Sequence, residues 1–124
     1  MRIRSSGPSD ARVALVTDYP GVAENRVGLP LIGKTGQEVN RHLEAIGLDR
    51  ESLFVAPLIR EWREDGEYTQ ADVDRDAPEL ASELAEVKPE LIVTMGRWSA
   101  RCFLGDVDVD EIYAMPWWAG ICDD

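Results

Sequence analysis

Three short apolar runs alternate with helical patterns along the chain, and this alternation constrains the fold more than any other feature. The runs lie at Arg12–Thr17, Ser52–Ile59 and Leu91–Met95. Such runs, with few polar positions, are typical of strands buried on both faces of a parallel sheet. A helix between consecutive strands lets each strand enter the sheet from the same edge. The sequence therefore predicts an α/β fold with three layers, α/β/α, around a central, mostly parallel sheet.

The segments between and after the runs carry the helical patterns. In the first, Val39, Leu43 and Ile46 share one helical face, and the following glycine ends the pattern. The longest pattern has apolar residues at three- and four-residue steps, at Val73, Ala77, Leu80, Leu84 and Val87. A third helix is expected over residues 97–104. Proline lacks the backbone N–H of a sheet ladder, so Pro57 should lie at a strand end or a bulge.

Length and composition restrict the classes of protein. The 124 residues, 44% of them apolar, suit one domain over 1–124 with a flexible polar lead-in at 1–10. The formal charge of −11 argues against an extended basic face for nucleic acid, although a small positive site remains compatible with it. Cys102 and Cys122 lack the spacing of a zinc or redox pair, so free thiols are expected. No apolar run reaches the length of a membrane span, and we expect a soluble, intracellular protein in the cytoplasm.

The connection after the first strand, Thr17–Gly36, is the most unusual segment. It contains four glycines and two prolines and is much longer than ordinary connections of about 4–6 residues. Because ligands bind beyond the carboxyl ends of strands in such folds, we expect a ligand-binding loop. Its second half also matches the P-loop pattern G-x-x-x-x-G-K-[ST]. A P-loop begins directly after a strand, however, and Gly28 is separated from the strand by Pro20 and polar residues, so nucleotide hydrolysis is the less favoured interpretation.

A second interpretation explains more of this connection. Its spacing resembles the first motif of the uracil-DNA glycosylase superfamily, closest to the family 4 branch, at Pro20, Gly21, Glu24, Arg26, Gly28, Pro30, Gly33 and Gly36. That motif reads Gly-Glu-Ala-Pro-Gly, an acidic stretch and then Gly-x-Pro-Phe-Val-Gly-x-x-Gly. The resemblance covers roughly residues 12–105 and includes KPELIVTMG at the third strand. It implies the fold of family 4 or phage-type glycosylases, which flip uracil out of DNA and cleave its N-glycosidic bond in base excision repair.

The resemblance also implies a set of site residues. Asp18 stands at the position of the family's glutamate, so it is the expected catalytic carboxylate that positions or activates water. The pocket for uracil is expected to include Thr17, Tyr19, Pro20, Gly21, Leu31, Gly33 and Pro57. Cleavage builds positive charge on the sugar and negative charge on the departing base. A carboxylate beside the sugar and oriented donors beside the base therefore lower the barrier.

Several of these residues depart from the family's pattern. Thr17 replaces a glycine, and Asp18 is one methylene shorter than glutamate. Tyr19 places a ring where the family has a small residue. Leu31 replaces the phenylalanine on which the base stacks, and Pro57 replaces the asparagine that reads the polar edge of the base. Proline offers neither a side-chain donor nor a backbone N–H, so base reading is expected to differ.

Two further features of the family have weak counterparts or none. The positions of two cysteines that hold the family 4 iron–sulfur cluster align with Glu61 and Asp76, so we expect neither a cluster nor another metal. The family's His-Pro motif has at most a degenerate remnant at Met115-Pro116. The only histidine, His42, is expected to face solvent on the first helix. The C-terminal part of the family domain is therefore expected to be missing.

These departures leave two other classes of protein open. The chain could be a catalytically degenerate module of the same fold that binds nucleic acid, a modified base or a protein partner. Tyr113, Trp117 and Trp118 suit either stacking on bases or contact with a partner. The acidic composition also permits a DNA-mimicking inhibitor, whose binding to a basic protein would be sensitive to salt.

Overall fold

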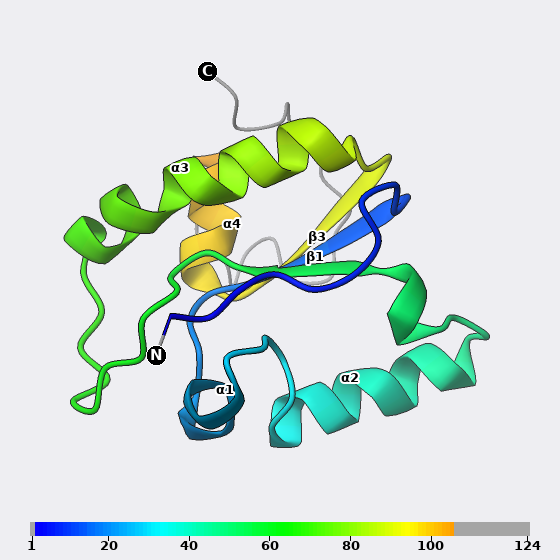
Figure 1. Cartoon of the computed structure of the whole chain (residues 1–124), viewed down its shortest axis with the longest axis horizontal. Helices are drawn as coiled ribbons and strands as arrows, with labels where there is room; N and C mark the ends of the chain where they lie inside the picture. Colours follow the sequence, from blue (N-terminus) through cyan, green and yellow to red (C-terminus); the bar gives the residue numbers. More distant parts are fainter. Residues whose placement is uncertain (1, 106–124) are drawn as a thin grey trace.

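The computed structural model describes residues 2–105, which form a parallel sheet of three strands with helices around it (Figure 1). The strands are β1 (Val13–Thr17), β2 (Phe54–Pro57) and β3 (Leu91–Met95), in the spatial order β2-β1-β3. The helices are α1 (Val22–Val27), α2 (Lys34–Ala45), α3 (Gln70–Val87) and α4 (Arg97–Leu104), with a 3-10 turn at Arg50–Ser52. The predicted α/β fold with a parallel sheet is confirmed.

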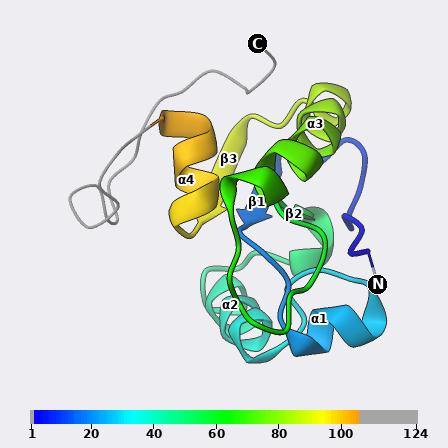
Figure 2. The same cartoon turned by 90° about the vertical axis from the view of Figure 1, so that its left-hand side faces the viewer.

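Helices cover both faces of the sheet. In two perpendicular views α3 and α4 lie on one face, and α1 and α2 lie on the other (Figures 1 and 2). Successive strand residues point to opposite faces, so neighbouring residues enter different cores. Val16 of β1 packs in the cluster with Leu80 of α3, whereas Leu15 packs in the cluster with Val39 of α2.

The longest helix, α3, follows its predicted pattern. Val73, Leu80 and Leu84 are buried against the sheet. At its start, the Asp72 carboxylate accepts a hydrogen bond of 2.9 Å from the N–H of Thr69, which satisfies a donor that helix geometry leaves unpaired. Within residues 2–105, neither α3 nor any other helix combines the length and apolar character needed to cross a membrane.

Three apolar side chains expected to be buried are exposed. Ile46 is 70% exposed, because α2 ends one residue earlier and the chain turns at Gly47. On β3, Leu91 and Val93 are 54% and 40% exposed. On the face of the sheet that α2 covers, the buried strand residues belong to β1 and β2. The described part of the chain does not cover Leu91 and Val93 of β3 on this face. The prediction of a strand buried on both faces is therefore wrong for β3.

The N-terminal segment differs from the flexible lead-in expected for residues 1–10. Ile3 is fully buried, and its N–H donates to the carbonyl of Arg60 at 2.8 Å. Ser6 and Val55 exchange two backbone hydrogen bonds, of 2.9 and 2.8 Å, in an antiparallel bridge. The segment thus lies along the outer edge of β2. This pairing joins residues far apart in the sequence, and the polar composition of the segment gave no sign of it.

The connection between β1 and α2 contains a helix, α1, which the sequence did not predict. Its first turn is closed by Glu24, whose carboxylate accepts from the N–H of Gly21 at 2.8 Å. Gly28, with φ of 84°, ends the helix in the left-handed conformation that suits glycine. The long loop is therefore two short connections with an ordered helix between them.

Candidate active site

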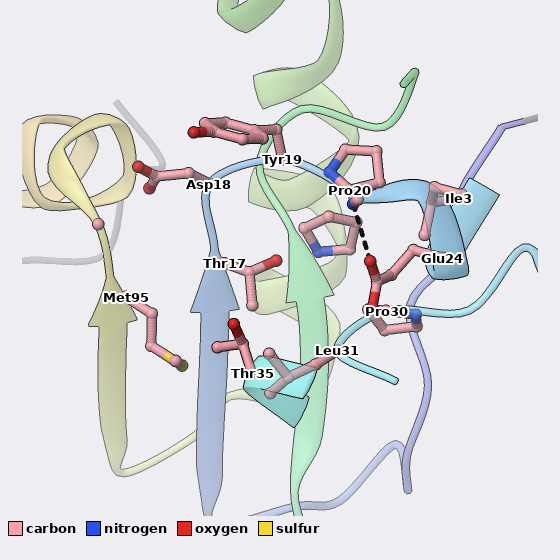
Figure 3. A pocket seen from close by; sticks show the side chains of 13 residues that line it. Ile3, Thr17, Asp18, Tyr19, Pro20, Glu24, Pro30, Leu31, Thr35 and Met95 are labelled. Carbon is pink, nitrogen blue, oxygen red and sulfur yellow. Dashed lines mark hydrogen bonds between the residues drawn. The ribbon is translucent and has the colours of Figure 1, made fainter. Parts of the chain in front are cut away.

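A cavity of about 300 Å³ opens at the carboxyl ends of the three strands (Figure 3). Its wall is assembled from the ends of β1, β2 and β3, the start of α1, the start of α2 and the N-terminal segment. The volume lies at the lower end of the range for small-molecule pockets. Ligands commonly bind at this position, beyond the carboxyl ends of the strands, in parallel α/β sheets.

Seven of the eight residues expected at the site line this cavity. They are Asp18, Thr17, Tyr19, Pro20, Gly21, Leu31 and Pro57. The eighth, Gly33, is absent from the lining among the described residues, and its N–H donates to Glu24 at 2.8 Å. The sequence did not predict the other lining residues, which are Ile3, Glu24, Pro30, Thr35, Met95 and Gly96. Gly96 directly follows a predicted strand, so its place at this edge could have been inferred.

The carboxylate of Asp18 is held by the first turn of α4. Oδ1 accepts from the N–H and the hydroxyl of Ser99 at 2.8 and 2.7 Å, and Oδ2 accepts from the N–H of Trp98 at 3.1 Å. In Figure 3 the side chain is directed towards this helix. A Cβ on Gly96 would lie 2.1 Å from Oδ2, so the approach requires glycine. The carboxylate is thus fixed in orientation, with acceptor capacity left on Oδ2.

Glu24 ties together the two connections that form one wall of the cavity. Its carboxylate accepts three backbone hydrogen bonds of 2.8 Å, from Gly21, Ile32 and Gly33. Partial burial alone would raise the pKa of Glu24, but the hydrogen bonds from Ile32, Gly33 and Gly21 outweigh it and hold the pKa below its usual value. An acidic residue three positions after the residue that caps a helix is a known capping signal, so the sequence carried evidence for this role.

Leu31 has a strained backbone, with φ of 54°. Leucine rarely adopts the left-handed region, and such residues persist only where their surroundings impose the conformation. Here the Arg50 guanidinium donates to the carbonyls of Leu31 and Pro30, the second at 2.7 Å. Gly36 approaches so closely that a Cβ on it would lie 2.0 Å from the Leu31 oxygen. Arg50 and Gly36 therefore hold Leu31 in this conformation in the cavity wall.

Tyr19 lies at the mouth of the cavity and stacks on Tyr68. The ring centroids are 4.2 Å apart, with 18° between the ring planes. The Tyr68 hydroxyl accepts from the N–H of Arg63 at 3.0 Å, which fixes the second ring. Tyr19 remains 48% exposed. The ring therefore extends the cavity wall outward and offers an aromatic face at the entrance.

Residues 4–119 match the family model for the uracil DNA glycosylase superfamily. The chain belongs to this superfamily. It is 26% identical over 105 residues to the type-4 uracil-DNA glycosylase of Archaeoglobus fulgidus. The matched region covers 84% of this chain and 53% of that protein. This chain is also 27% identical over 99 residues to the type-4 enzyme of Saccharolobus solfataricus, with a matched region that covers 78% of this chain and 46% of that protein. The chain thus spans about half the length of the curated relatives it matches.

Glu61 and Asp76, which the resemblance to family 4 aligns with two cluster cysteines, belong to an ion network. Arg75 pairs with Glu61 at 3.0 Å and with the fully buried Asp76 at 2.8 Å. Asp76 also accepts from the N–H of Arg60 at 2.8 Å. Iron–sulfur clusters are held by thiolates, whereas these two carboxylates pair with arginines, so the absence of a cluster stays a prediction that these contacts support. Among the described residues, no group of histidine, cysteine and carboxylate side chains is arranged to hold a metal ion.

The remaining residues with a predicted role are His42 and several residues near the C-terminus. The His42 side chain is 83% exposed, as expected. Met115-Pro116, the aromatic residues Tyr113, Trp117 and Trp118, and Cys122 lie outside the described residues.

Proposed function

We propose that this protein recognises uracil flipped out of DNA and hydrolyses its N-glycosidic bond. Membership of the superfamily supports glycosylase-like chemistry, and the observation that carries the proposal is the cavity with Asp18 in its wall at the carboxyl ends of the strands. A flipped base must enter a pocket beside a group that can orient water. The open cavity and the Asp18 carboxylate in its wall support both requirements.

The proposed reaction uses water as the nucleophile. Asp18 Oδ2, which retains acceptor capacity, orients a water molecule towards C1′ of the deoxyribose. The water oxygen bonds to C1′ as the C1′–N1 bond breaks, and the electron pair leaves with the base. One water proton ends on the departing base, which yields uracil and an abasic site. The donors that fix Asp18 keep its negative charge close to the positive charge that develops on the sugar.

A second candidate is a binding module that has kept the scaffold and lost catalysis. The three hydrogen bonds from Ser99 and Trp98 make Asp18 an anchor for α4, which is a structural use of the same carboxylate. Leu31 provides no aromatic face inside the cavity, and Pro57 provides no donor. These features would permit binding of nucleic acid or of a protein partner without excision.

The deciding experiment measures abasic product from single-stranded and mismatched duplex oligonucleotides containing one uracil, at low and at molar salt. The full chain is compared with Asp18→Asn and with Asp74→Asn, which alters an exposed carboxylate on α3. Product that is lost in Asp18→Asn and kept in Asp74→Asn supports the proposed reaction. Binding of uracil-containing DNA without any product supports a module that binds nucleic acid, and absence of both product and DNA binding contradicts the proposed reaction and the nucleic-acid form of the binding module.

A further inference from the structure

Five side chains in the cavity wall carry hydrogen-bonding groups: Thr17, Asp18, Tyr19, Glu24 and Thr35. The two carboxylates are largely committed, Asp18 to the first turn of α4 and Glu24 to three backbone N–H groups. The Tyr19 ring is held against Tyr68 at the entrance. The polar side chains left for a ligand are therefore two threonines, Thr17, which is buried, and Thr35, which is exposed at the start of α2.

Thr17 and Thr35 reach the cavity from different elements. Thr17 is the last residue of β1, is 9% exposed, and lies opposite Pro57 in the register of β1 and β2. Thr35 belongs to the first turn of α2. Figure 3 shows both side chains in the wall near the ends of these strands. Within residues 2–105, no hydrogen bond occupies either hydroxyl.

We propose that the hydroxyls of Thr17 and Thr35 bind the polar edge of the base. This inference rests on the proposed function and concerns the base that the cavity selects. A side-chain amide held by its neighbours presents a donor and an acceptor in fixed places. A threonine hydroxyl rotates, and it can donate to a carbonyl oxygen or accept from an amino group.

Because each threonine hydroxyl can either donate or accept, the two hydroxyls do not distinguish bases that differ only in a donor or an acceptor. Uracil and cytosine differ at C4, where one has a carbonyl oxygen and the other an amino group. Pro57, which faces Thr17 across the strand pair, supplies no side-chain group that would favour either. The two threonines and Pro57 therefore give no fixed preference at C4, and we expect uracil and cytosine to bind with similar affinity.

The test compares the binding of single-stranded oligonucleotides that carry one non-cleavable 2′-fluoro-deoxyuridine, one 2′-fluoro-deoxycytidine or one tetrahydrofuran abasic analogue. Fluorescence anisotropy on the full chain gives each affinity relative to the abasic analogue, which removes the contribution of the DNA backbone. The variants are Thr17→Val and Thr35→Val, which replace the hydroxyl by a methyl group of similar size. Thr17→Ser retains a hydroxyl, and Thr94→Val makes the same change at a threonine on β3 that is not in the cavity lining.

The wild-type chain should bind the uracil and cytosine oligonucleotides within about threefold of each other, and both more tightly than the abasic analogue. Each valine variant should lose about three- to tenfold in affinity for both bases, as expected for one hydrogen bond. Thr17→Ser and Thr94→Val should bind like the wild type. Thermal unfolding of each variant identifies any loss that comes from misfolding.

Two different results would overturn the inference. Valine variants that bind like the wild type, or a preference for uracil above about tenfold, would contradict base reading by these hydroxyls and leave the proposed function intact. Equal binding of all three oligonucleotides by the wild type would mean that the cavity takes no base, and the proposed function would fail together with the inference.

Discussion

The Asp18 carboxylate and Ser99 are joined by two hydrogen bonds, of 2.8 Å from the backbone N–H and 2.7 Å from the hydroxyl. Asp18 follows β1, and Ser99 lies in the first turn of α4, so the contact fastens a helix to the end of the central strand. The positive end of the helix macrodipole adds to the attraction. The residue proposed for catalysis is thus also part of the scaffold that shapes the cavity.

Removal of the Ser99 hydroxyl should weaken this fastening without abolishing it. Ser99→Ala keeps the two backbone donors and loses one charge-assisted hydrogen bond, so we expect a loss of about 2 kcal/mol in the free energy of unfolding. Urea denaturation measures the change. The control, Ser52→Ala, removes an exposed hydroxyl that donates to Asp49 and should cost less than about 1 kcal/mol. Equal losses in the two variants would contradict a special role for the Ser99 contact.

Glu24 should make stability depend on pH. Because its pKa is lowered on folding, its contribution is present above the ordinary glutamate pKa, about 4.3, and is lost as pH falls through the lowered folded value. Glu24→Gln should cost about 2 kcal/mol at pH 7, and the difference from wild type should shrink as the pH falls below about 4.

Urea denaturation between pH 7 and pH 3 gives this comparison. Glu44→Gln, at an exposed position of α2, is the matched control and should remain within about 0.5 kcal/mol of the wild type throughout. A wild-type advantage over Glu24→Gln that grows towards low pH would have the wrong sign for this mechanism.

Arg50 should be irreplaceable by lysine. Its guanidinium donates to the carbonyls of Leu31 and Pro30 at once, and an ammonium group is a compact point charge that lacks this fork. We expect Arg50→Lys to lower the free energy of unfolding by about 2 kcal/mol and to weaken base binding, since Leu31 would no longer be held in its strained conformation. Calorimetry and the anisotropy assay check the two effects. Arg41→Lys, at a site that is 71% exposed, should change neither.

Asp76 should be essential to the ion network that binds α3 to the N-terminal segment. Asp76→Asn removes the fully buried carboxylate that pairs with Arg2 and Arg75. Both arginines are partly exposed and keep other acidic partners, so solvent screening limits the expected loss to about 1–3 kcal/mol. Asp74→Asn, two residues away and exposed, should cost less than about 0.5 kcal/mol. Thermal unfolding that is unchanged in Asp76→Asn would show that the network contributes little.

The main elements of the fold could be predicted because their signals are local. The spacing of Val73, Leu80 and Leu84 is enough to define a helical face, and the apolar runs are enough to define strands. The same local signal failed for β3, where Leu91 and Val93 are exposed, because burial depends on what packs above a strand. It failed for Ile3 as well, since an isolated apolar residue in a polar segment shows no periodicity.

The sequence by itself determined the order of the strands and of the three longer helices, the superfamily motif and most residues of the cavity wall, since all of these follow from residue type and spacing along the chain. Only the tertiary structure decided how the polar groups of that wall are used. Asp18 bonds to Ser99, Glu24 to Ile32 and Gly33, and Arg50 to Leu31. Hydrogen bonds depend on atoms meeting within about 3 Å in a defined direction, and packing alone brings such distant residues together.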